Sequence, residues 1–128
     1  MGKNTNSLNW FEVPANDIAL AAQFYEFIFV FKMEPLEDIM GMKMVSFPND
    51  PTSGKTNGAL VKSDLHKPSK EGSMIYLNAN PSIQIVLNRI EKAGGKIVTP
   101  KTQITPEIGY MAFFIGTEGN KIGLHVQN

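Results

Sequence analysis

The side chain best placed to do chemistry in this sequence is a carboxylate within an apolar strand. Glu12 stands between Phe11 and Val13, and an unpaired carboxylate is costly to bury among such neighbours. We therefore expect a hydrogen-bonded companion for Glu12, with His125 or Tyr76 as candidates. Two interpretations stay open: a general base or ligand-orienting group with a raised pKa, or an exposed or structurally paired glutamate near the mouth of a sheet.

The chain has two histidines, and His125 allows several roles. It could donate a proton, act with Glu12 as a substitute metal ligand, or be a purely structural or exposed residue. His66 lies in a polar connection and is predicted to be solvated. The candidate catalytic residues are therefore Glu12 and His125.

The overall composition argues against several classes of partner. Twelve basic and twelve acidic residues leave a formal net charge of zero, so no global field favours nucleic acid. The absence of cysteine removes disulfides, thiolate zinc sites and thiol nucleophiles. The polar N-terminal segment lacks the apolar core of a secretory signal, and no apolar run approaches the roughly 20 residues needed to cross a membrane. We expect a cytoplasmic protein without a membrane partner.

The hydrophobic pattern predicts the elements that position these residues. An apolar run ends at Pro14, and Asn16-Asp17 then caps a helix whose apolar residues recur every three or four positions. Strands are expected at residues 8–13, 33–37, 42–47 and 57–62. A second series follows, with strands at 73–79, 96–98, 109–115 and 121–126, and a helix that begins at Pro81 and ends at Gly94-Gly95.

The order strand, helix, three strands thus occurs twice. Residues 12–16 align with 76–80 at an offset of 64, and residues 41–47 align with 109–115 at an offset of 68. The pattern predicts one α+β domain over residues 1–128, with a first module at about 8–62, a linker at 63–72 and a second module at about 73–127.

Three segments in this order of elements carry a family resemblance: VPANDIALAAQFYEFIF, EKAGGKIVTP and GYMAFFIGTEGNKIGLHVQ. The chain resembles the vicinal oxygen chelate superfamily, which includes glyoxalases, bleomycin-resistance proteins and extradiol dioxygenases. The resemblance implies two tandem βαβββ modules that form a curved, partly closed mixed sheet around a cavity, commonly completed in a homodimer. In the enzymes of the family, this cavity holds one divalent metal.

The four places of the family's metal ligands can be compared with this sequence. The resemblance puts them at Trp10, at Met74, within Asn57–Ser63 and at Gly123. The window Asn57–Ser63 holds no histidine, aspartate or glutamate, and the other three residues cannot supply the nitrogen and carboxylate donors that divalent cations need. We therefore predict no cofactor, with a Zn, Ni, Mn or Fe ion as the alternative.

The family positions also predict which side chains face the cavity. If Trp10 and Gly123 face inward, the two-residue period of strands turns Glu12 and His125 inward too. The repeat pairs the face of Met42, Met44 and Ser46 with Tyr110, Ala112 and Phe114. The predicted ligand-binding residues are Trp10, Met44, Met74, Tyr76, Tyr110, Phe114 and Gly123.

This apolar, sulfur-rich lining is typical of a site for a small, largely apolar or aromatic ligand. We expect a protein that binds such a molecule without a metal. The alternative is a lyase, isomerase or dioxygenase that acts through Glu12 and His125, either metal-free or with displaced metal ligands.

Overall fold

The first half of the chain forms one βαβββ module. The computed structural model describes residues 1–127. The elements of this first module are β1 (Trp10–Pro14), α1 (Ile18–Phe29), β2 (Glu34–Pro35), β3 (Lys43–Ser46), the short 3-10 helix η1 (Pro51–Ser53) and β4 (Asn57–Lys62). The expected cap of the helix is present, because the Asp17 side chain accepts a hydrogen bond from the Leu20 backbone N–H at 3.0 Å.

The second half repeats the same order. The elements of this second module are β5 (Tyr76–Asn78), α2 (Ile83–Ile90), β6 (Lys96–Thr105), β7 (Gly109–Ile115) and β8 (Lys121–Val126). The helix predicted to begin at Pro81 begins at Ile83, after the Ser82 cap, and two strand boundaries differ by more. The strand expected from residue 73 begins only at Tyr76, and the strand expected at 96–98 continues to Thr105, because its pairing with β7 resumes after several register shifts.

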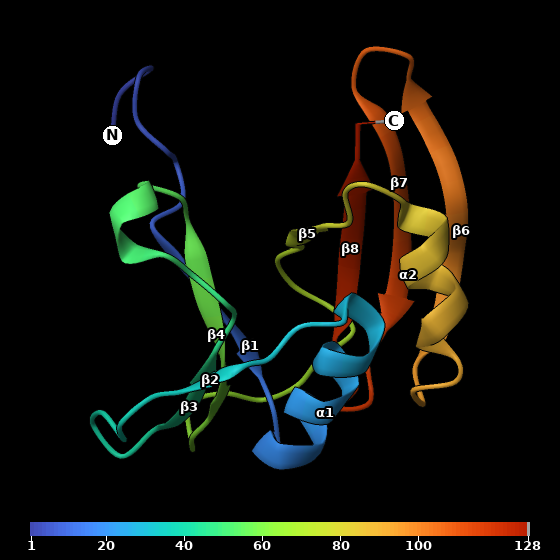
Figure 1. Cartoon of the computed structure of the whole chain (residues 1–128). Helices are drawn as coiled ribbons and strands as arrows, with labels where there is room; N and C mark the ends of the chain where they lie inside the picture. Colours follow the sequence, from blue (N-terminus) through green and yellow to red (C-terminus); the bar gives the residue numbers. More distant parts are fainter. Residues whose placement is uncertain (128) are drawn as a thin grey trace.

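Each module builds its own four-stranded mixed sheet. The strand orders are β1-β4-β3-β2 and β5-β8-β7-β6, so β1 and β5 occupy equivalent edges. Figure 1 shows the two sheets on opposite sides of the molecule, with β5 nearest the first module. The tandem βαβββ fold is confirmed, and the sheets do not join into a closed barrel.

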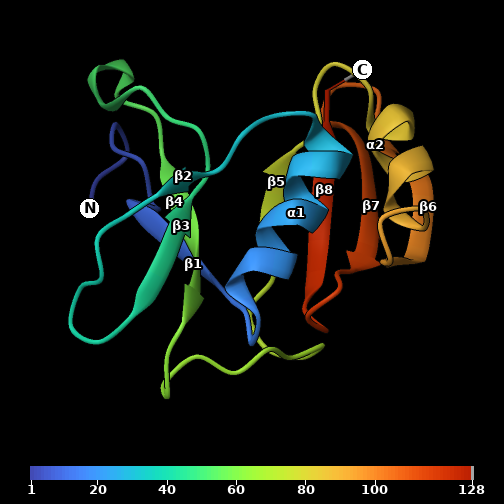
Figure 2. The same ribbon diagram turned by 60° about the horizontal axis from the view of Figure 1, so that its bottom comes forward.

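One hydrophobic core holds the two modules together. Its buried members include Val13 and Leu60 of the first sheet, Phe24 of α1, and Phe114 and Leu124 of the second sheet. Figure 2 shows α1 between the two sheets, and this helix packs against β3, β4 and α2. Since both sheets turn one face to this core, their other faces point away from it; we call these the open faces.

The β7–β8 turn adds a polar joint between the modules. The Glu118 carboxylate accepts hydrogen bonds from the backbone N–H groups of Asn16 and Asp17, at 2.6 and 2.7 Å. Asn120, which is buried, donates to the Pro14 carbonyl at 2.6 Å and accepts from the Ser69 N–H at 3.0 Å. The start of α1 is therefore tied to the far end of the chain.

The internal repeat extends to the strand register. Glu12 pairs with Ala59, and Tyr76 pairs with Gly123. Tyr76 lies 64 positions after Glu12, and Gly123 lies 64 positions after Ala59. The predicted offset of 64 therefore describes the β1/β4 and β5/β8 pairs.

The predicted offset for β3 and β7 is wrong by one residue. Met44 pairs with Val61, and Met111 pairs with His125, which makes Met44 equivalent to Met111 at an offset of 67. A slip of one residue moves every side chain to the other face of a strand. The residues of β7 on the open face are consequently Met111 and Phe113, rather than the neighbours expected from the sequence.

No helix in residues 1–127 is both long and apolar enough to cross a membrane.

Candidate functional site

The largest hollow that we describe lies between the modules. Its volume is about 610 Å³, within the usual range for small-molecule sites of roughly 300 to 1,000 Å³. The lining includes five aromatic residues and several small polar ones, but no Asp, Glu, Lys, Arg or His. These residues are Leu8, Phe11, Phe29, Phe31, Phe47, Pro48, Thr56, Asn57, Ser73, Met74, Ile75, Tyr76, Leu77 and Asn78. We call this hollow the intermodule cavity.

Segments far apart in sequence position the aromatic wall of this cavity. Phe29 ends α1, Phe31 follows it, and the two rings stack at a centroid distance of 5.4 Å. Phe47, directly after β3, lies 5.6 Å from the Phe11 ring of β1 and 6.0 Å from the Phe31 ring. The opposite wall comes from residues 73–78, which run into the edge strand β5. Two of the predicted ligand-binding residues, Met74 and Tyr76, line this wall.

A second, more open hollow lies on the other side of β5. Its lining includes Tyr76, Asn78 and His125, and its volume is about 590 Å³. The Nε2 atom of His125 is 2.8 Å from the Ile108 carbonyl oxygen, which identifies Nε2–H as the donor and leaves Nδ1 without a proton in the neutral ring. The structure therefore brings Tyr76 and His125 together at one hollow.

Glu12 has a companion, but not one of the expected residues. Its Oε1 atom is 2.8 Å from His66 Nε2, and its Oε2 atom accepts a hydrogen bond from the Trp10 indole N–H at 3.2 Å. The side chains of His66 and Glu12 are 16% and 31% exposed. The expectation of a solvated His66 is thus wrong, because the connection after β4 folds back over the open face of the first sheet.

The two predicted catalytic residues do not meet. Glu12 lies on the open face of the first sheet, and His125 lies on the open face of the second. Each has a hydrogen-bond partner of its own, His66 for Glu12 and the Ile108 carbonyl for His125. A joint acid–base or metal site of Glu12 and His125 within one chain is therefore not formed.

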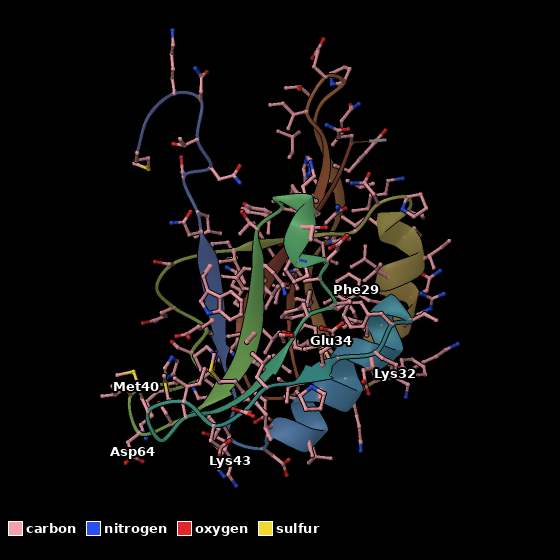
Figure 3. The ribbon with its side chains drawn as sticks, turned by 60° about the vertical axis from the view of Figure 1, so that its left-hand side comes forward. Phe29, Lys32, Glu34, Met40, Lys43 and Asp64 are labelled. Atoms are coloured by element: carbon pink, nitrogen blue, oxygen red, sulfur yellow. The ribbon has the colours of Figure 1, made fainter. Side chains whose placement is uncertain are left out.

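The remaining predicted ligand-binding residues divide between the two faces of the sheets. Trp10 and Met44 lie on the open face of the first sheet with Glu12. Figure 3 shows Phe29 beside α1, to the right of β1 and β4. Phe114 is instead fully buried in the core, 5.9 Å from the Phe24 ring, and so lines no hollow. Tyr110 shares that core-facing side of β7, with the Lys101 ammonium over its ring at 4.5 Å.

The glycine of the last strand has a steric explanation. A Cβ atom at Gly123 would lie 2.6 Å from Cδ1 of Tyr76 and 3.1 Å from the Ile75 carbonyl oxygen. The Tyr76 ring crosses over Gly123 toward Phe113, with a centroid distance of 5.8 Å between the two rings. Gly123 is therefore the place where an aromatic ring lies directly against the strand backbone.

The structure shows which donor atoms lie at the family's four metal positions. The register places Ala59 beside Glu12, while Gly123 lies under the Tyr76 ring. Trp10 directs its indole N–H at Glu12 and offers no lone pair to a cation. In the described part of the chain, no three His, Cys, Asp or Glu side chains form a group that could hold an ion. The residues at the four positions do not fit a divalent metal.

Sequence reasoning missed the most closely connected polar cluster. Ser63 Oγ lies 2.6 Å from His66 Nδ1, so a serine, a histidine and Glu12 form one chain of hydrogen bonds. The available signal was a Ser-x-x-His turn directly after an apolar strand. The aromatic wall was missed too, because the cavity arises only when the modules pack.

Comparisons with known proteins agree with the fold. Residues 7–124 match the family model described as the Glyoxalase/Bleomycin resistance protein/Dioxygenase superfamily. A Glyoxylase-like domain-containing protein from Didymella fabae is 30% identical over 115 residues, which cover 85% of this chain and 84% of that protein. The chain belongs to the glyoxalase/bleomycin-resistance/dioxygenase superfamily.

Solved structures share the fold at lower identity. Hypothetical protein SA1046 from S. aureus is 24% identical, with a TM-score of 0.66 over 98% of this chain and 99% of that one. The genomically encoded fosfomycin resistance protein FosX from Listeria monocytogenes is 15% identical, with a TM-score of 0.65 over 96% of this chain and 92% of that one. These similarities support the fold.

Proposed function

We propose that this protein binds a small, uncharged, largely aromatic molecule in the intermodule cavity, without a divalent metal. The observation that carries the proposal is the lining of that cavity, which combines five aromatic rings with no Asp, Glu, Lys, Arg or His. A charged ligand would lose its hydration there without gaining an ionic partner. An aromatic ligand would instead gain stacking and edge contacts with the Phe29, Phe31 and Phe47 rings.

A few polar groups at the cavity would orient the ligand. Asn57 uses its side-chain N–H to donate to the Phe47 carbonyl at 2.9 Å, which leaves its amide oxygen as an acceptor. Tyr76 lines the opposite wall. A ligand with a hydrogen-bond donor on an aromatic frame suits this arrangement.

Binding can be tested with a panel of uncharged compounds of one or two aromatic rings, observed by saturation-transfer NMR. Ser73→Trp would fill the cavity from its rim and should weaken binding by at least about tenfold. Ser53→Trp is the matched control, because Ser53 is exposed and lies outside the cavity. If no compound binds, or if both variants bind like the parent, the proposal fails.

Independence from metal needs a separate measurement. Elemental analysis of protein purified without chelators should give far less than one Zn, Ni, Mn or Fe per chain, because the four family positions lack suitable donors. A stoichiometric metal that withstands gel filtration would contradict this part of the proposal and favour an enzyme with displaced ligands.

We also propose a homodimer, as the family resemblance implies. Phe27 is 49% exposed on α1, next to a hollow that Leu20 and Ala93 also line. Phe31, two residues after the end of α1, lines the intermodule cavity instead. Light scattering after gel filtration should show a dimer, and Phe27→Glu should shift it toward the monomer. A monomeric parent would refute this assembly.

A further inference from the structure

We propose that Ser63 is a nucleophile, with His66 as its base and Glu12 as the group that orients His66, at a site separate from the intermodule cavity. Ser63 Oγ is 2.6 Å from His66 Nδ1, and His66 Nε2 is 2.8 Å from Glu12 Oε1. None of these three residues lines the cavity. The proposal therefore goes beyond ligand binding there and does not depend on it.

The hydrogen bonds define the direction of proton transfer. An ionised carboxylate only accepts hydrogen bonds, so His66 Nε2 must carry the proton that it shares with Glu12. In the neutral ring Nδ1 is then an acceptor, and Ser63 Oγ–H is the donor to it. Serine, imidazole and carboxylate in this sequence are the arrangement that activates a hydroxyl nucleophile.

The backbone holds Ser63 and His66 in a fixed relation. Residues 63–66 form a turn in which the His66 N–H donates to the Ser63 carbonyl at 3.3 Å, and the Leu65 N–H donates to Ser63 Oγ at 3.1 Å. Glu12 is fixed in turn by its position within β1 and by the Trp10 indole. The Ser63 side chain thus needs no rearrangement to present its hydroxyl to the base.

The expected chemistry is acyl transfer from a small activated ester. Ser63 Oγ would attack the acyl carbon and form a new C–O bond, while its proton passes to His66 Nδ1. The ester C–O bond then breaks, and the alcohol leaves with the proton from His66. Water then attacks the acyl carbon of the acyl-serine and passes a proton to His66. The bond between Ser63 Oγ and the acyl group breaks, and His66 returns the proton to Ser63 as the acid leaves. Because Ser63 lies at a partly exposed turn rather than in an enclosed pocket, the substrate class is esters with good leaving groups rather than amides.

The chain contains its own controls. Ser53 and Ser69 are exposed, and each Oγ accepts a hydrogen bond from the backbone N–H two residues later, at 3.2 and 2.9 Å. Ser63 has the same local geometry with Leu65. The difference is the imidazole, so any excess reactivity of Ser63 reports the action of His66.

The test is labelling of the intact protein with an alkyl fluorophosphonate, mapped by peptide mass spectrometry. Ser63 should react about 100-fold faster than Ser53 and Ser69, as is typical for general-base assistance. His66→Ala should reduce this rate to that of the other two serines, and free imidazole should restore part of it. Glu12→Gln, which keeps the shape of the side chain, should lower the rate about tenfold without changing the circular dichroism spectrum.

An ester gives an independent readout. p-Nitrophenyl acetate should release a burst of p-nitrophenolate and acetylate Ser63, whereas Ser63→Ala should show no burst and still bind aromatic ligands in the cavity. Equal labelling of the three serines in the parent would overturn the proposal whatever the variants do. A His66→Ala rate equal to that of the parent, or failure of imidazole to restore it, would also overturn it.

Discussion

The two open faces carry equivalent strands but different chemistry. On the first sheet, Glu12 and Ala59 stand side by side, and the carboxylate is engaged by His66 from the connecting segment. On the second sheet, the equivalent pair is Tyr76 and Gly123, and the space is filled by an aromatic ring lying flat on the strand. A conserved register thus supports a polar cluster in one module and an aromatic one in the other.

This difference lies in what occupies the space beside the equivalent strand pairs. In the second module, the ring of Tyr76 occupies the space that a side chain at Gly123 would need. In the first module, the Glu12 carboxylate is hydrogen-bonded to the imidazole of His66 and to the indole N–H of Trp10. An aromatic ring fills the space beside Gly123, whereas hydrogen bonds hold the carboxylate beside Ala59.

The largest expected difference between the modules concerns two equivalent phenylalanines. Phe114 is fully buried between Phe24 and Tyr25, whereas Phe47 is 7% exposed and borders the intermodule cavity. Phe114→Ala should lower the free energy of unfolding by about 3–5 kcal/mol, and Phe47→Ala should fall at or below the low end of that range. Urea denaturation measures both. An equal or larger loss at Phe47 would show that the modules share the core more evenly.

Adding a methyl group at Gly123 and removing one at the equivalent Ala59 should both destabilise the fold, for different reasons. Gly123→Ala should destabilise the fold by about 1–3 kcal/mol, because the Cβ collides with the Tyr76 ring. Ala59→Gly should cost about 0.5–1 kcal/mol through added freedom of the unfolded chain.

A double-mutant cycle isolates the cause of the Gly123 effect. In a Tyr76→Ala background, the cost of Gly123→Ala should fall below about 1 kcal/mol, since the ring is gone. An unchanged cost would instead implicate the Ile75 carbonyl, which lies 3.1 Å from the added atom.

Tyr25 lies between the modules and makes their contact sensitive to alkali. Its ring contacts those of Phe47 and Phe114, and burial, together with the Glu118 carboxylate, raises the pKa of its hydroxyl. The unfolded chain loses this proton near pH 10 and the folded chain at higher pH, so stability is complete below about pH 10 and decreases above it.

The expected slope is up to about 1.4 kcal/mol per pH unit from this one group. Tyr25→Phe should flatten the alkaline part of a stability–pH curve measured by urea denaturation. A variant with the same alkaline slope as the parent would assign the loss to other residues.

The smallest expected effect is on the stability of the polar cluster. Glu12→Gln changes one partner of a hydrogen-bonded pair whose members are partly exposed, and such pairs contribute about 0–1 kcal/mol. Thermal denaturation should therefore show little change, while serine labelling responds clearly. A loss well above 1 kcal/mol would make the cluster structural instead.

The sequence predicted the fold well because periodicity and turn residues are local signals. The tandem order, the Asp17 cap and the offset of 64 between β1 and β5 followed from them. The predicted face of β7 was wrong, because an alignment error of one residue assigns every side chain to the opposite face of the strand. Tyr110 and Phe114 were therefore assigned to the ligand site, although they face the core.

The site was harder to predict because its parts meet only after folding. His66 and Glu12 are 54 positions apart, and no local pattern signals their contact. The intermodule cavity is formed by the ends of α1 and β3 together with the segment before β5, so it depends on how the modules pack. What could be foreseen was the need of Glu12 for a partner, since that follows from the cost of desolvating a charge.

The shared core also bears on how such a repeat could have arisen. A solitary module would leave Val13, Leu60 and the inner side of α1 in water, a surface too apolar for a stable monomer. An ancestral half-length chain would therefore have needed another copy of itself to cover that surface. Duplication and fusion would then have made permanent, within one polypeptide, an association that previously depended on concentration.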